Sequence, residues 1–379
     1  MSNAKKPTLV AARSLLSSTT MSSSTAKPPL WKIWFVASRP HTLPVSLAPN
    51  IVAYNAGLAF IEFGGRSTAE TETDAANIAS YFWLTVEWTL FCILMQLGTN
   101  LHNDYADFVK GADNDKRVGQ ARATQKGWLT PFQTAAASGL TLLVGLFLGM
   151  RFVGKMNLMK PTMGVIVATS IFNAFAYTGG PWPLGYIGLP NFSLGYSGLG
   201  DLFVFLYFGL AATLVPPFLY VAYNANANAN AGDDDAHDTQ QQQQPQKYLY
   251  DLLWKFAPYA IQVAVLATNI IVVNNLRDRH TDVHANKRTL AVRFGATFCR
   301  VEYAINLMVA YGGVLVMGSS SSSFSTIQLL PLLSLPLAWK EWQAISNKEG
   351  GALNQHVGGA ARLQTIFCIL LAISIRNGN

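Results

Sequence analysis

The chain has 379 residues, of which 50% are hydrophobic and only 12% are charged, and its formal net charge is +7. Soluble domains carry roughly 25% charged residues, so this composition predicts a membrane protein. A broad basic surface for nucleic acid is excluded, because the bases stand mainly beside acids or in the first forty residues. The three cysteines lie in or beside apolar runs, which indicates buried thiols and no disulfide framework.

Residues 1–30 are rich in Ser, Thr and Ala and contain no acid, and the first acidic residue of the chain is Glu62. A basic, Ser-rich, acid-poor leader is typical of organelle transit peptides. A disordered amino terminus has the same composition, so both interpretations stay open. The sequence predicts a leader over 1–30, followed by one membrane domain over 31–379.

Apolar stretches near the ~20 residues that cross a bilayer as a helix recur along the domain. They cover 42–61, 79–101, 131–153, 160–178, 200–223, 254–276, 299–317, 325–340 and 361–376. The pattern therefore predicts an all-α membrane protein with about nine spans. Between the fifth and sixth spans, residues 224–247 consist of Asn/Ala, Asp and Gln runs, which predict a disordered loop.

Two stretches place acids and then bases at the end of an apolar span, at 96–127 and at 274–293. Acids and amides at this spacing suit Mg²⁺, which binds through one or two carboxylates together with substrate phosphates. The bases that follow suit phosphate oxygens. The first stretch offers Asn103, Asp104, Asp107, Asp113, Arg117, Arg122 and Lys126, and the second offers Asn274, Asp278, Asp282, Lys287 and Arg288.

An even number of spans separates the two stretches, so the loops after the second and sixth spans lie on one side of the membrane. The loop at 177–200 falls on the same side. On a continuing helix Asn103 and Asp104 each share a face with Asp107, and Asn274, Asp278 and Asp282 form an i, i+4, i+8 row. One such row can be a solvated helix end. Two rows on one membrane side indicate a functional site, because ionisable groups at membrane depth are costly.

Three features outside the two rows are also candidate parts of a site: the loop at 177–186, the pair Arg39 and His41, and Glu87. The loop YTGGPWPLGY at 177–186 is either an interfacial aromatic turn or a site element, with Tyr177 and backbone amides facing a substrate. Arg39 can reach an anionic acceptor, whereas His41 beside it more simply caps the first span. Glu87 lies ~25 Å from Asp104 along a helix, near the opposite face, so it is expected to be either a snorkelling acid or a locally paired one, outside the site.

Several stretches together resemble the UbiA superfamily of membrane prenyltransferases, and most closely its 1,4-dihydroxy-2-naphthoate polyprenyltransferase branch. The stretches are SRPHTLP (38–44), QLGTNLHNDYADFVKGAD (96–113), RVGQARATQKG (117–127), YTGGPWPLGY (177–186), GLGDLFVFLYFG (198–209) and VVNNLRDRHTDVHANKRTLAVRFG (272–295). Together they span residues 38–295, and the combination of 96–113 with 272–295 is highly specific.

The resemblance implies a nine-helix bundle around a central active-site cavity. It implies that Asn103, Asp104, Asp107, Asp278 and Asp282 hold Mg²⁺ against a prenyl diphosphate. It places Asn274 where many members have the first acid of the second motif, and it places Arg122, Lys287 and Tyr177 at the diphosphate. Three positions depart from the pattern: Asp113 lies further along than the usual third acid, Pro181 replaces a Lys, and Asn286 replaces a Gly.

The expected activity is Mg²⁺-dependent transfer of a phytyl or polyprenyl group to 1,4-dihydroxy-2-naphthoate with loss of its carboxylate, in menaquinone or phylloquinone synthesis. The alternative acceptors are homogentisate and 4-hydroxybenzoate. A cation-coupled transporter is the alternative of another class. The expected partners are the two substrates and the bilayer, with no nucleic acid. The leader and the implied pathway together favour a plastid membrane, with a mitochondrial membrane as the second choice.

Overall fold

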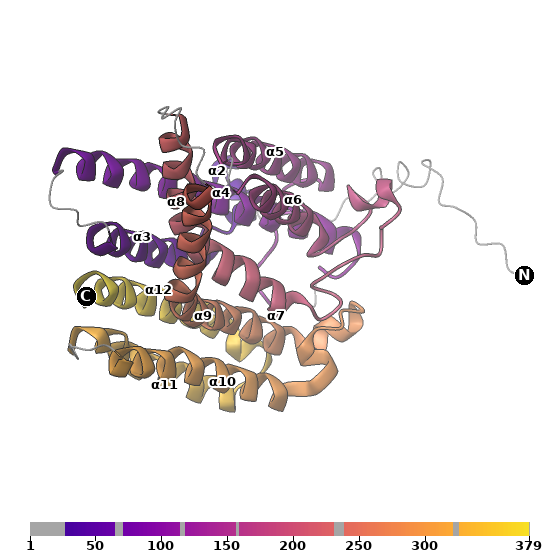
Figure 1. Ribbon diagram of the computed structural model, residues 1–379. Helices are drawn as coiled ribbons and strands as arrows, with labels where there is room; N and C mark the ends of the chain where they lie inside the picture. The colour runs from indigo at the N-terminus through magenta and orange to yellow at the C-terminus, as the bar shows by residue number, and fades with distance from the viewer. Residues whose placement is uncertain are drawn as a thin grey trace, which may run out of the picture.

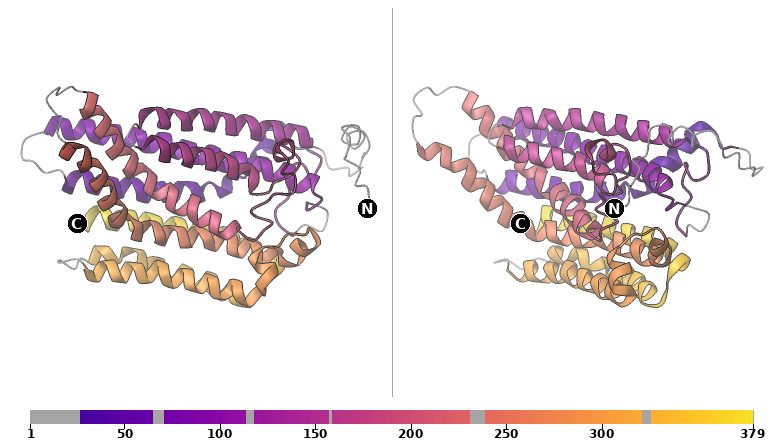
Figure 2. Two further views of the ribbon diagram at one scale, coloured as in Figure 1. Left: turned by 45° about the vertical axis from the view of Figure 1, so that its right-hand side comes forward. Right: turned by 90° about the vertical axis from the view of Figure 1, so that its right-hand side faces the viewer.

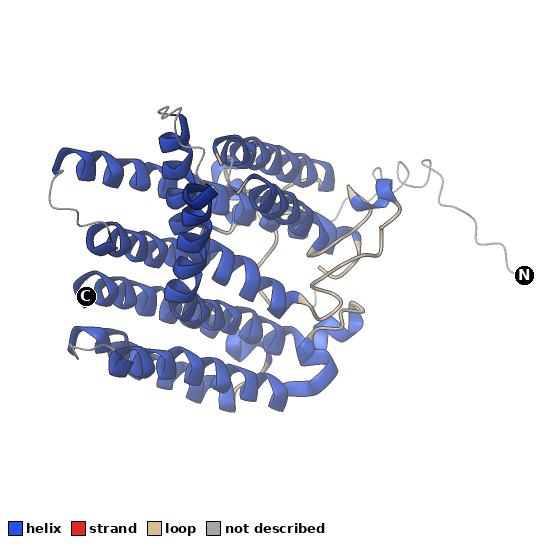
Figure 3. Cartoon of the chain, in the orientation of Figure 1, coloured by secondary structure: helices blue, strands red, loops and turns tan. Residues whose placement is uncertain are grey.

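The computed structural model describes residues 27–64, 71–113, 118–156, 159–230, 239–320 and 326–378. Every regular element in these ranges is a helix (Figure 3). The long helices are α3 (Pro44–Gly64), α4 (Thr71–Val109), α5 (Pro131–Lys155), α6 (Lys160–Ala176), α8 (Ala212–Asn230), α9 (Thr239–His284), α10 (Leu290–Ser320), α11 (Leu335–Asn347) and α12 (Asn354–Asn377). The short ones are α2 (Leu30–Ser38), η1 (Pro40–Thr42), η2 (Leu184–Ile187), α7 (Gly200–Phe203), η3 (Val204–Ala211), η4 (Thr326–Ser334) and η5 (Gly350–Leu353).

The long helices lie side by side in one bundle (Figures 1 and 2). Helix α4 packs against α5, α9 packs against α10, and α12 contacts both α3 and α9. The links that follow α4, α6 and α9 meet at one end of the bundle, where Lys110 contacts Thr178 and Lys287 contacts Asp107. These contacts confirm the single side that span parity predicts for the two acid–base stretches.

Seven helices of the described ranges are long and apolar enough to cross a membrane. The multi-pass, all-helical membrane fold predicted from the sequence is therefore confirmed. The predicted spans at 160–178 and 325–340 correspond to α6, which has 17 residues, and to η4 followed by α11, which has 13. Because both helices fall short of the usual spanning length, the total of nine spans stays a prediction.

Close packing of α4 against α5 depends on residues that lack a side chain. A Cβ atom at Gly98 would lie 2.5 Å from the Leu142 side chain, and one at Gly145 would lie 2.3 Å from the Met95 side chain. Small residues allow membrane helices to approach closely and to gain dispersion energy that lipid cannot supply. The same interface buries Trp88 and Phe91 of α4, and it fixes α4 as one wall of the functional site.

Two helices differ from the predicted elements in ways that affect the site. The span predicted at 200–223 begins as α7 and continues as η3, a π-helical segment, before α8. Such wide turns occur frequently at functional sites. Helix α8 runs to Asn230 and α9 begins at Thr239, so helix takes in both ends of the loop predicted at 224–247. The middle of that loop, like most of the predicted leader, lies outside the described ranges.

Candidate active site

A cavity of about 820 Å³ lies where the last turns of α4 and α9 face the first half of α12. Its wall also includes η3 and the links that follow α4 and α6. The residues selected from the sequence that line it are Arg39, Asn103, Asp107, Arg122, Tyr177, Asn274, Asp278, Asp282 and Lys287. The fold therefore brings both acid–base stretches to one cavity.

Of the predicted site residues on α4, Asn103 and Asp107 line the cavity, as do Gln96, Thr99 and Asn100 of the same helix. Asn103 Oδ1 accepts a hydrogen bond from the Thr178 hydroxyl, and Asp107 Oδ1 accepts one from the Tyr196 hydroxyl at 2.9 Å. Residues four apart lie on one face of an α-helix, because a turn holds 3.6 residues. Asn103 and Asp107 therefore share the cavity-facing side of α4.

Asp104 is fully buried behind the cavity wall. Its Oδ2 accepts a hydrogen bond from the backbone N–H of Ala123 at 3.2 Å, whereas its Oδ1 is buried without a hydrogen-bond partner. This placement differs from the face shared with Asp107 that the sequence predicts. An unpaired buried carboxylate oxygen is costly. Asp104 thus holds the link after α4 through one carboxylate oxygen, and the other oxygen makes no hydrogen bond within the protein.

Arg122 lies in that link and faces the acids of α4. Its guanidinium nitrogens are 3.7 Å from Asp107 Oδ2 and 3.5 Å from Asp113 Oδ2. Burial alone would lower the pKa of Arg122, but the charges of Asp113, Asp107 and Asp104 raise it above the usual value. The guanidinium therefore stays charged inside the protein, and Asp113 serves as its buried counter-ion.

On α9, all three members of the predicted row line the cavity, and Arg277 engages two of them. Arg277 donates to both carboxylate oxygens of Asp278, at 2.8 and 2.6 Å, and to Asn274 Oδ1 at 2.8 Å. Such a bidentate pair is strong and directional. The sequence analysis missed Arg277, although it directly precedes an acid of the row.

Lys287 connects the two rows. Its ammonium nitrogen lies 3.4 Å from Asp107 Oδ1 on α4 and 3.8 Å from Asp282 Oδ1 on α9. Two carboxylates from helices far apart in the sequence thus share one cation at the cavity wall. That geometry is the central feature of the site.

The other predicted bases lie elsewhere. The side chain of Arg288 is exposed and Lys126 is exposed in the link after α4; neither lines the cavity. Arg117 lies outside the described ranges. Glu87 pairs with Arg151 and Lys155 at 3.4 and 3.3 Å, so of the two alternatives predicted for it the locally paired acid is confirmed.

Tyr196 and Lys110 are two further residues that sequence reasoning missed. Lys110 Nζ donates to the Thr178 carbonyl at 2.7 Å and lies 3.5 Å from the centre of the Tyr196 ring. Burial lowers the pKa of Lys110 to about 8, and burial and the charge of Asp107 raise the pKa of Tyr196 well above its usual value. The signal that could have found Lys110 is its i, i+3 spacing from Asp107.

The link after α6 closes on itself through backbone groups. The Tyr177 carbonyl accepts hydrogen bonds from Gly195 N–H and the Ser193 hydroxyl, both at 2.8 Å. Gly179 has φ 71°, and a Cβ there would lie 2.0 Å from the Phe192 carbonyl oxygen. Only glycine fits this position. The ring of Tyr177 is thereby held at the cavity, and burial raises the pKa of its hydroxyl above the usual value, with Asp201 as the next cause.

Arg39 and His41 line the cavity where α2 leads into η1. Arg39 donates to the Asn100 carbonyl at 2.5 Å and adopts a left-handed backbone conformation, with φ 53°. Burial lowers the pKa of His41, and the positive charges of Arg39 and Arg122 lower it further. His41 is therefore neutral at physiological pH, which suits a polar wall residue beside cationic neighbours.

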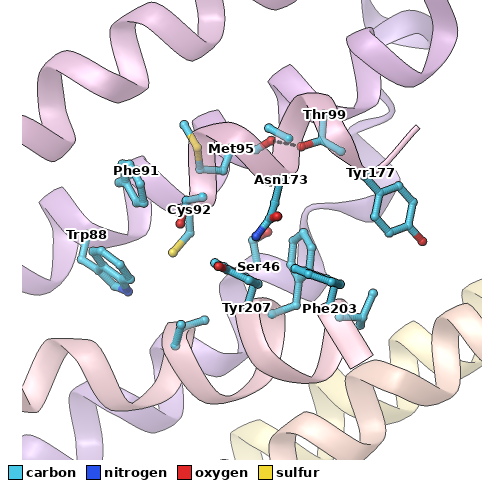
Figure 4. Close-up of a pocket in the computed structure, with 16 residues that line it drawn as sticks. Ser46, Trp88, Phe91, Cys92, Met95, Thr99, Asn173, Tyr177, Phe203 and Tyr207 are labelled. Carbon is cyan, nitrogen blue, oxygen red and sulfur yellow. Dashed lines mark hydrogen bonds between the residues drawn. The ribbon is translucent and has the colours of Figure 1, made fainter. Parts of the chain in front are cut away.

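An apolar chamber of about 80 Å³ adjoins the cavity and shares Thr99, Tyr177, Val204 and Phe208 with its wall. In Figure 4, the rings of Trp88 and Phe91 lie at one end of this chamber and Tyr177 lies at the other. The polar site therefore continues into an aromatic-lined space between α4, α6 and η3.

On α12, Arg362 and Ile366 line the cavity with accessible side chains, and 42% of Ile366 is accessible. Pro44 and Val45 of α3 line the cavity as well. Because α3 and α12 are both candidate membrane spans, this part of the wall is built from spanning helices.

The acids fit a divalent metal that binds together with a phosphate ligand. In the part of the chain that the structure describes, no three Asp, Glu, His or Cys side chains are close enough to hold a metal among themselves. Mg²⁺ commonly needs only one or two carboxylates when phosphates complete its shell. The cavity-facing Asp107 and the unpaired Oδ1 of Asp104 supply oxygen atoms of that kind.

A family model and several named proteins are similar in sequence to most of this chain. The model of the UbiA prenyltransferase family matches residues 74–357. A Mycobacterium leprae protein named 1,4-dihydroxy-2-naphthoate octaprenyltransferase is 28% identical over 89% of this chain and 94% of its own length, and an Escherichia coli protein of the same name is 29% identical over 81% and 83%.

A Drosophila melanogaster protein, UbiA prenyltransferase domain-containing protein 1 homolog, is 25% identical over 90% of this chain and 79% of its own length. The family match covers both acid rows, the intervening links and the start of α12, and so takes in most of the cavity wall. The chain therefore belongs to the UbiA prenyltransferase family and is a multi-pass membrane enzyme of prenyl transfer.

Proposed function

We propose that the protein transfers a prenyl group from a prenyl diphosphate to 1,4-dihydroxy-2-naphthoate. The observation that carries this proposal is Lys287, whose ammonium group lies 3.4 Å from Asp107 and 3.8 Å from Asp282. A diphosphate with a bound metal needs carboxylates to bind the metal and cations to bind the phosphate oxygens. Lys287 and its two carboxylate neighbours bring both kinds of group together at the cavity wall. The names of the bacterial relatives support the choice of acceptor.

The metal in this proposal is Mg²⁺, held by Asn103, Asp107, Asp278 and Asp282 at the cavity with Asn274 beside them; Asp104, the remaining predicted ligand, would have to turn from its place behind the wall to join them. When bound, the ion neutralises negative charge on the diphosphate. Arg277 now engages Asp278, so this arginine must release the carboxylate or turn its own free N–H groups to the phosphate oxygens. Arg122, Lys287 and Tyr177 form the remaining polar wall around the diphosphate.

The chain's own groups act on charge and on water. As the C–O bond of the donor breaks, the diphosphate keeps the electron pair, and Arg122 and Lys287 stabilise the charge that grows on it. The apolar wall contributed by Val204, Phe208 and Ala361 excludes water from the allylic cation. The electron-rich ring then forms the new C–C bond. In the proposed net reaction the prenylated ring carbon gives up its proton, and the carboxylate leaves as CO₂ while a proton takes its place on the ring, which yields the demethylated quinol precursor of menaquinone or phylloquinone.

We place the donor tail along α12, whose Ile366 lines the cavity and is 42% accessible. A phytyl or longer polyprenyl group can extend from the cavity past Ile366 into lipid, so its length need not match the cavity. We place the naphthoate carboxylate near Arg39, which is a cation of the cavity wall. A bidentate guanidinium contact suits a planar carboxylate.

The direct test uses purified protein with Mg²⁺, 1,4-dihydroxy-2-naphthoate and donors that range from geranyl to octaprenyl diphosphate. Prenylated product and free diphosphate should form in equal amounts, and EDTA should stop both. No turnover with any donor would overturn the enzymatic proposal. Turnover with homogentisate or 4-hydroxybenzoate but not with the naphthoate would overturn the choice of acceptor.

The leader supports a separate proposal, that the enzyme resides in an organelle membrane, of a plastid or secondly of a mitochondrion. Residues 1–30 are basic and free of acids, as transit peptides are. A fluorescent protein fused behind residues 1–40 should be imported into the organelle. A diffuse cytosolic signal would contradict the proposal without affecting the proposed chemistry.

A further inference from the structure

Tyr196 occupies a junction between three parts of the site. Its hydroxyl donates to Asp107 Oδ1 at 2.9 Å. Its carbonyl accepts from the Arg288 N–H at 2.8 Å, and its own N–H donates to the Ser193 hydroxyl at 3.2 Å. The backbone of this tyrosine is therefore tied both to the link after α6 and to the turn between α9 and α10, while its side chain reaches α4.

Two lysines fix the ring of Tyr196. Lys110 Nζ lies 3.5 Å from the ring centre and Lys287 Nζ lies 4.8 Å from it. Lys110 is itself held by the Thr178 carbonyl at 2.7 Å. An ammonium group this close to an aromatic face is attracted by the ring quadrupole. With its backbone and its ring both held, the phenol has little freedom, and its hydroxyl meets Asp107 in one orientation.

The same oxygen of Asp107 has two partners, because Lys287 Nζ also lies 3.4 Å from Oδ1. The hydroxyl of Tyr196 is neutral, so it orients the carboxylate without cancelling its charge. Without that hydroxyl, Lys287 would no longer share this oxygen with Tyr196 and would pair with it more tightly. A tighter ion pair would hold the carboxylate away from a metal and the lysine away from a phosphate.

We propose that Tyr196 is a positioning residue that holds Asp107 ready for the metal–diphosphate ligand and limits its pairing with Lys287. This inference rests on the proposed function, because it assumes that a metal and a diphosphate bind at Asp107. Hydrogen-bond partners behind a metal ligand typically change metal affinity 10- to 100-fold when they are removed. The hydroxyl of Tyr196 stands in that relation to Asp107.

The test replaces only the hydroxyl. Tyr196→Phe keeps the ring that Lys110 and Lys287 contact, and Tyr186→Phe is the matched control because Tyr186 lies in the same link and is 83% exposed. Mn²⁺ binding to the full-length protein is measured by electron paramagnetic resonance in the presence of inorganic diphosphate. Tyr196→Phe should weaken Mn²⁺ binding roughly 10-fold or more, whereas Tyr186→Phe should bind like the wild type.

Kinetics supply a second readout. For Tyr196→Phe the Mg²⁺ concentration at half-maximal rate should rise by a similar factor, kcat should recover at high Mg²⁺, and the KM of the aromatic acceptor should not change. Equal Mn²⁺ affinity for Tyr196→Phe and wild type would overturn the inference, even if Tyr196→Leu were impaired, because the ring alone would then matter. Absence of Mn²⁺ binding by the wild type would overturn the proposed metal site as well.

Discussion

Lys287 and Arg288 are adjacent in the chain but stand in different surroundings. Lys287 lines the cavity between Asp107 and Asp282, whereas Arg288 is exposed. Lys287→Met removes the cation shared by the two carboxylates and one donor to the diphosphate. A charged hydrogen bond contributes about 1.5–3 kcal/mol, so kcat/KM for the prenyl diphosphate should fall roughly 10- to 100-fold.

Arg288→Met is the matched control and should change kcat/KM less than about threefold, because substitutions of exposed residues usually have small effects. The comparison requires steady-state kinetics with one donor at saturating acceptor. Similar losses in both variants would show that the pair acts as a general positive patch, and would contradict the specific placement of Lys287.

Lys110 gives the activity a pH dependence. Its pKa falls from 10.5 to about 8 in the folded protein, so it loses its proton above pH 8. The neutral amine no longer attracts the ring of Tyr196 as a cation, and turnover should decline as pH rises through about 8. Lys110→Arg should move this decline to higher pH, because arginine stays protonated. An unchanged pH–rate profile in Lys110→Arg would refute the assignment.

The contribution of Lys110 to the free energy of unfolding changes with pH in the direction opposite to the activity. Below pH 8 both folded and unfolded chains carry the proton, and the cost of burying the charge is fully present. Between about 8 and 10.5 the unfolded chain binds more protons, so the contribution of this group to stability rises with pH. Loss of activity without loss of thermal stability over this range would distinguish titration of Lys110 from unfolding.

At the scale of elements, α12 and the aromatic chamber offer two routes for the donor tail. Ala361 lines the cavity on α12, and Ala174 lines the chamber on α6. If the tail leaves past α12, Ala361→Trp should lower kcat/KM for octaprenyl diphosphate roughly 10-fold more than for geranyl diphosphate, and Ala174→Phe should affect both donors alike. Competition between donors of different length measures these ratios.

Ile369→Trp is the control for the first variant, since Ile369 is also on α12, is 41% exposed and does not line the cavity. It should not alter the preference between donors. Selective loss of long donors in Ala174→Phe, with Ala361→Trp unaffected, would instead assign the tail to the chamber beside Trp88 and Phe91.

Much of this arrangement is predictable from the order of elements in the sequence. Apolar lengths predicted the helices, and span parity predicted that Asp107 and Asp282 meet on one side of the membrane. Parity gives the side of the membrane on which residues lie but not the distance between them. The contact of Lys287 with both acids therefore could not be predicted from the sequence and is known only from the structure. Helical periodicity left Asp104 and Asp107 on a shared face, because it cannot tell which part of that face the cavity occupies.

Unlike Lys110, the missed residues Tyr196 and Arg277 have no spacing signal that assigns them to the site. Tyr196 contacts Asp107, which is 89 residues away, through a link whose path depends on Gly179 and on the Tyr177 carbonyl. Arg277 lies between predicted site residues, but whether it faces solvent or Asp278 depends on the packing of α9. Both contacts arise from tertiary structure and not from periodicity, so pattern analysis does not find them.

For the molecule as a whole, the carboxylates of the site are already partnered by its own cations. Asp107 contacts Arg122 and Lys287, and Asp278 contacts Arg277. Mg²⁺ alone or diphosphate alone would leave uncompensated charge in a bundle of low dielectric. Together they should raise the melting temperature of the detergent-solubilised protein by more than the sum of their separate effects. Saturation to 100 times Kd corresponds to about 2.7 kcal/mol of added stability.

Asp282→Asn should abolish most of this joint effect. The unliganded protein should keep a similar melting temperature, because the amide oxygen at position 282 can still face Lys287 without a charge. Differential scanning fluorimetry with each ligand alone and with both provides the measurement. Strictly additive shifts in the wild type would contradict the paired binding of metal and diphosphate.

The position of Ile366 on a spanning helix has a consequence for how turnover is sustained. Ile366 lines the cavity on α12, a candidate membrane span, whereas His41 and the links line it outside the spans. The two products of the proposed reaction therefore separate by solubility: diphosphate escapes to the aqueous phase, and the prenylated ring dissolves in the bilayer. The membrane acts as an extracting solvent that draws the reaction forward. A micelle offers far less hydrocarbon volume, so turnover in detergent should slow early as prenylated product accumulates, and added liposomes should restore it.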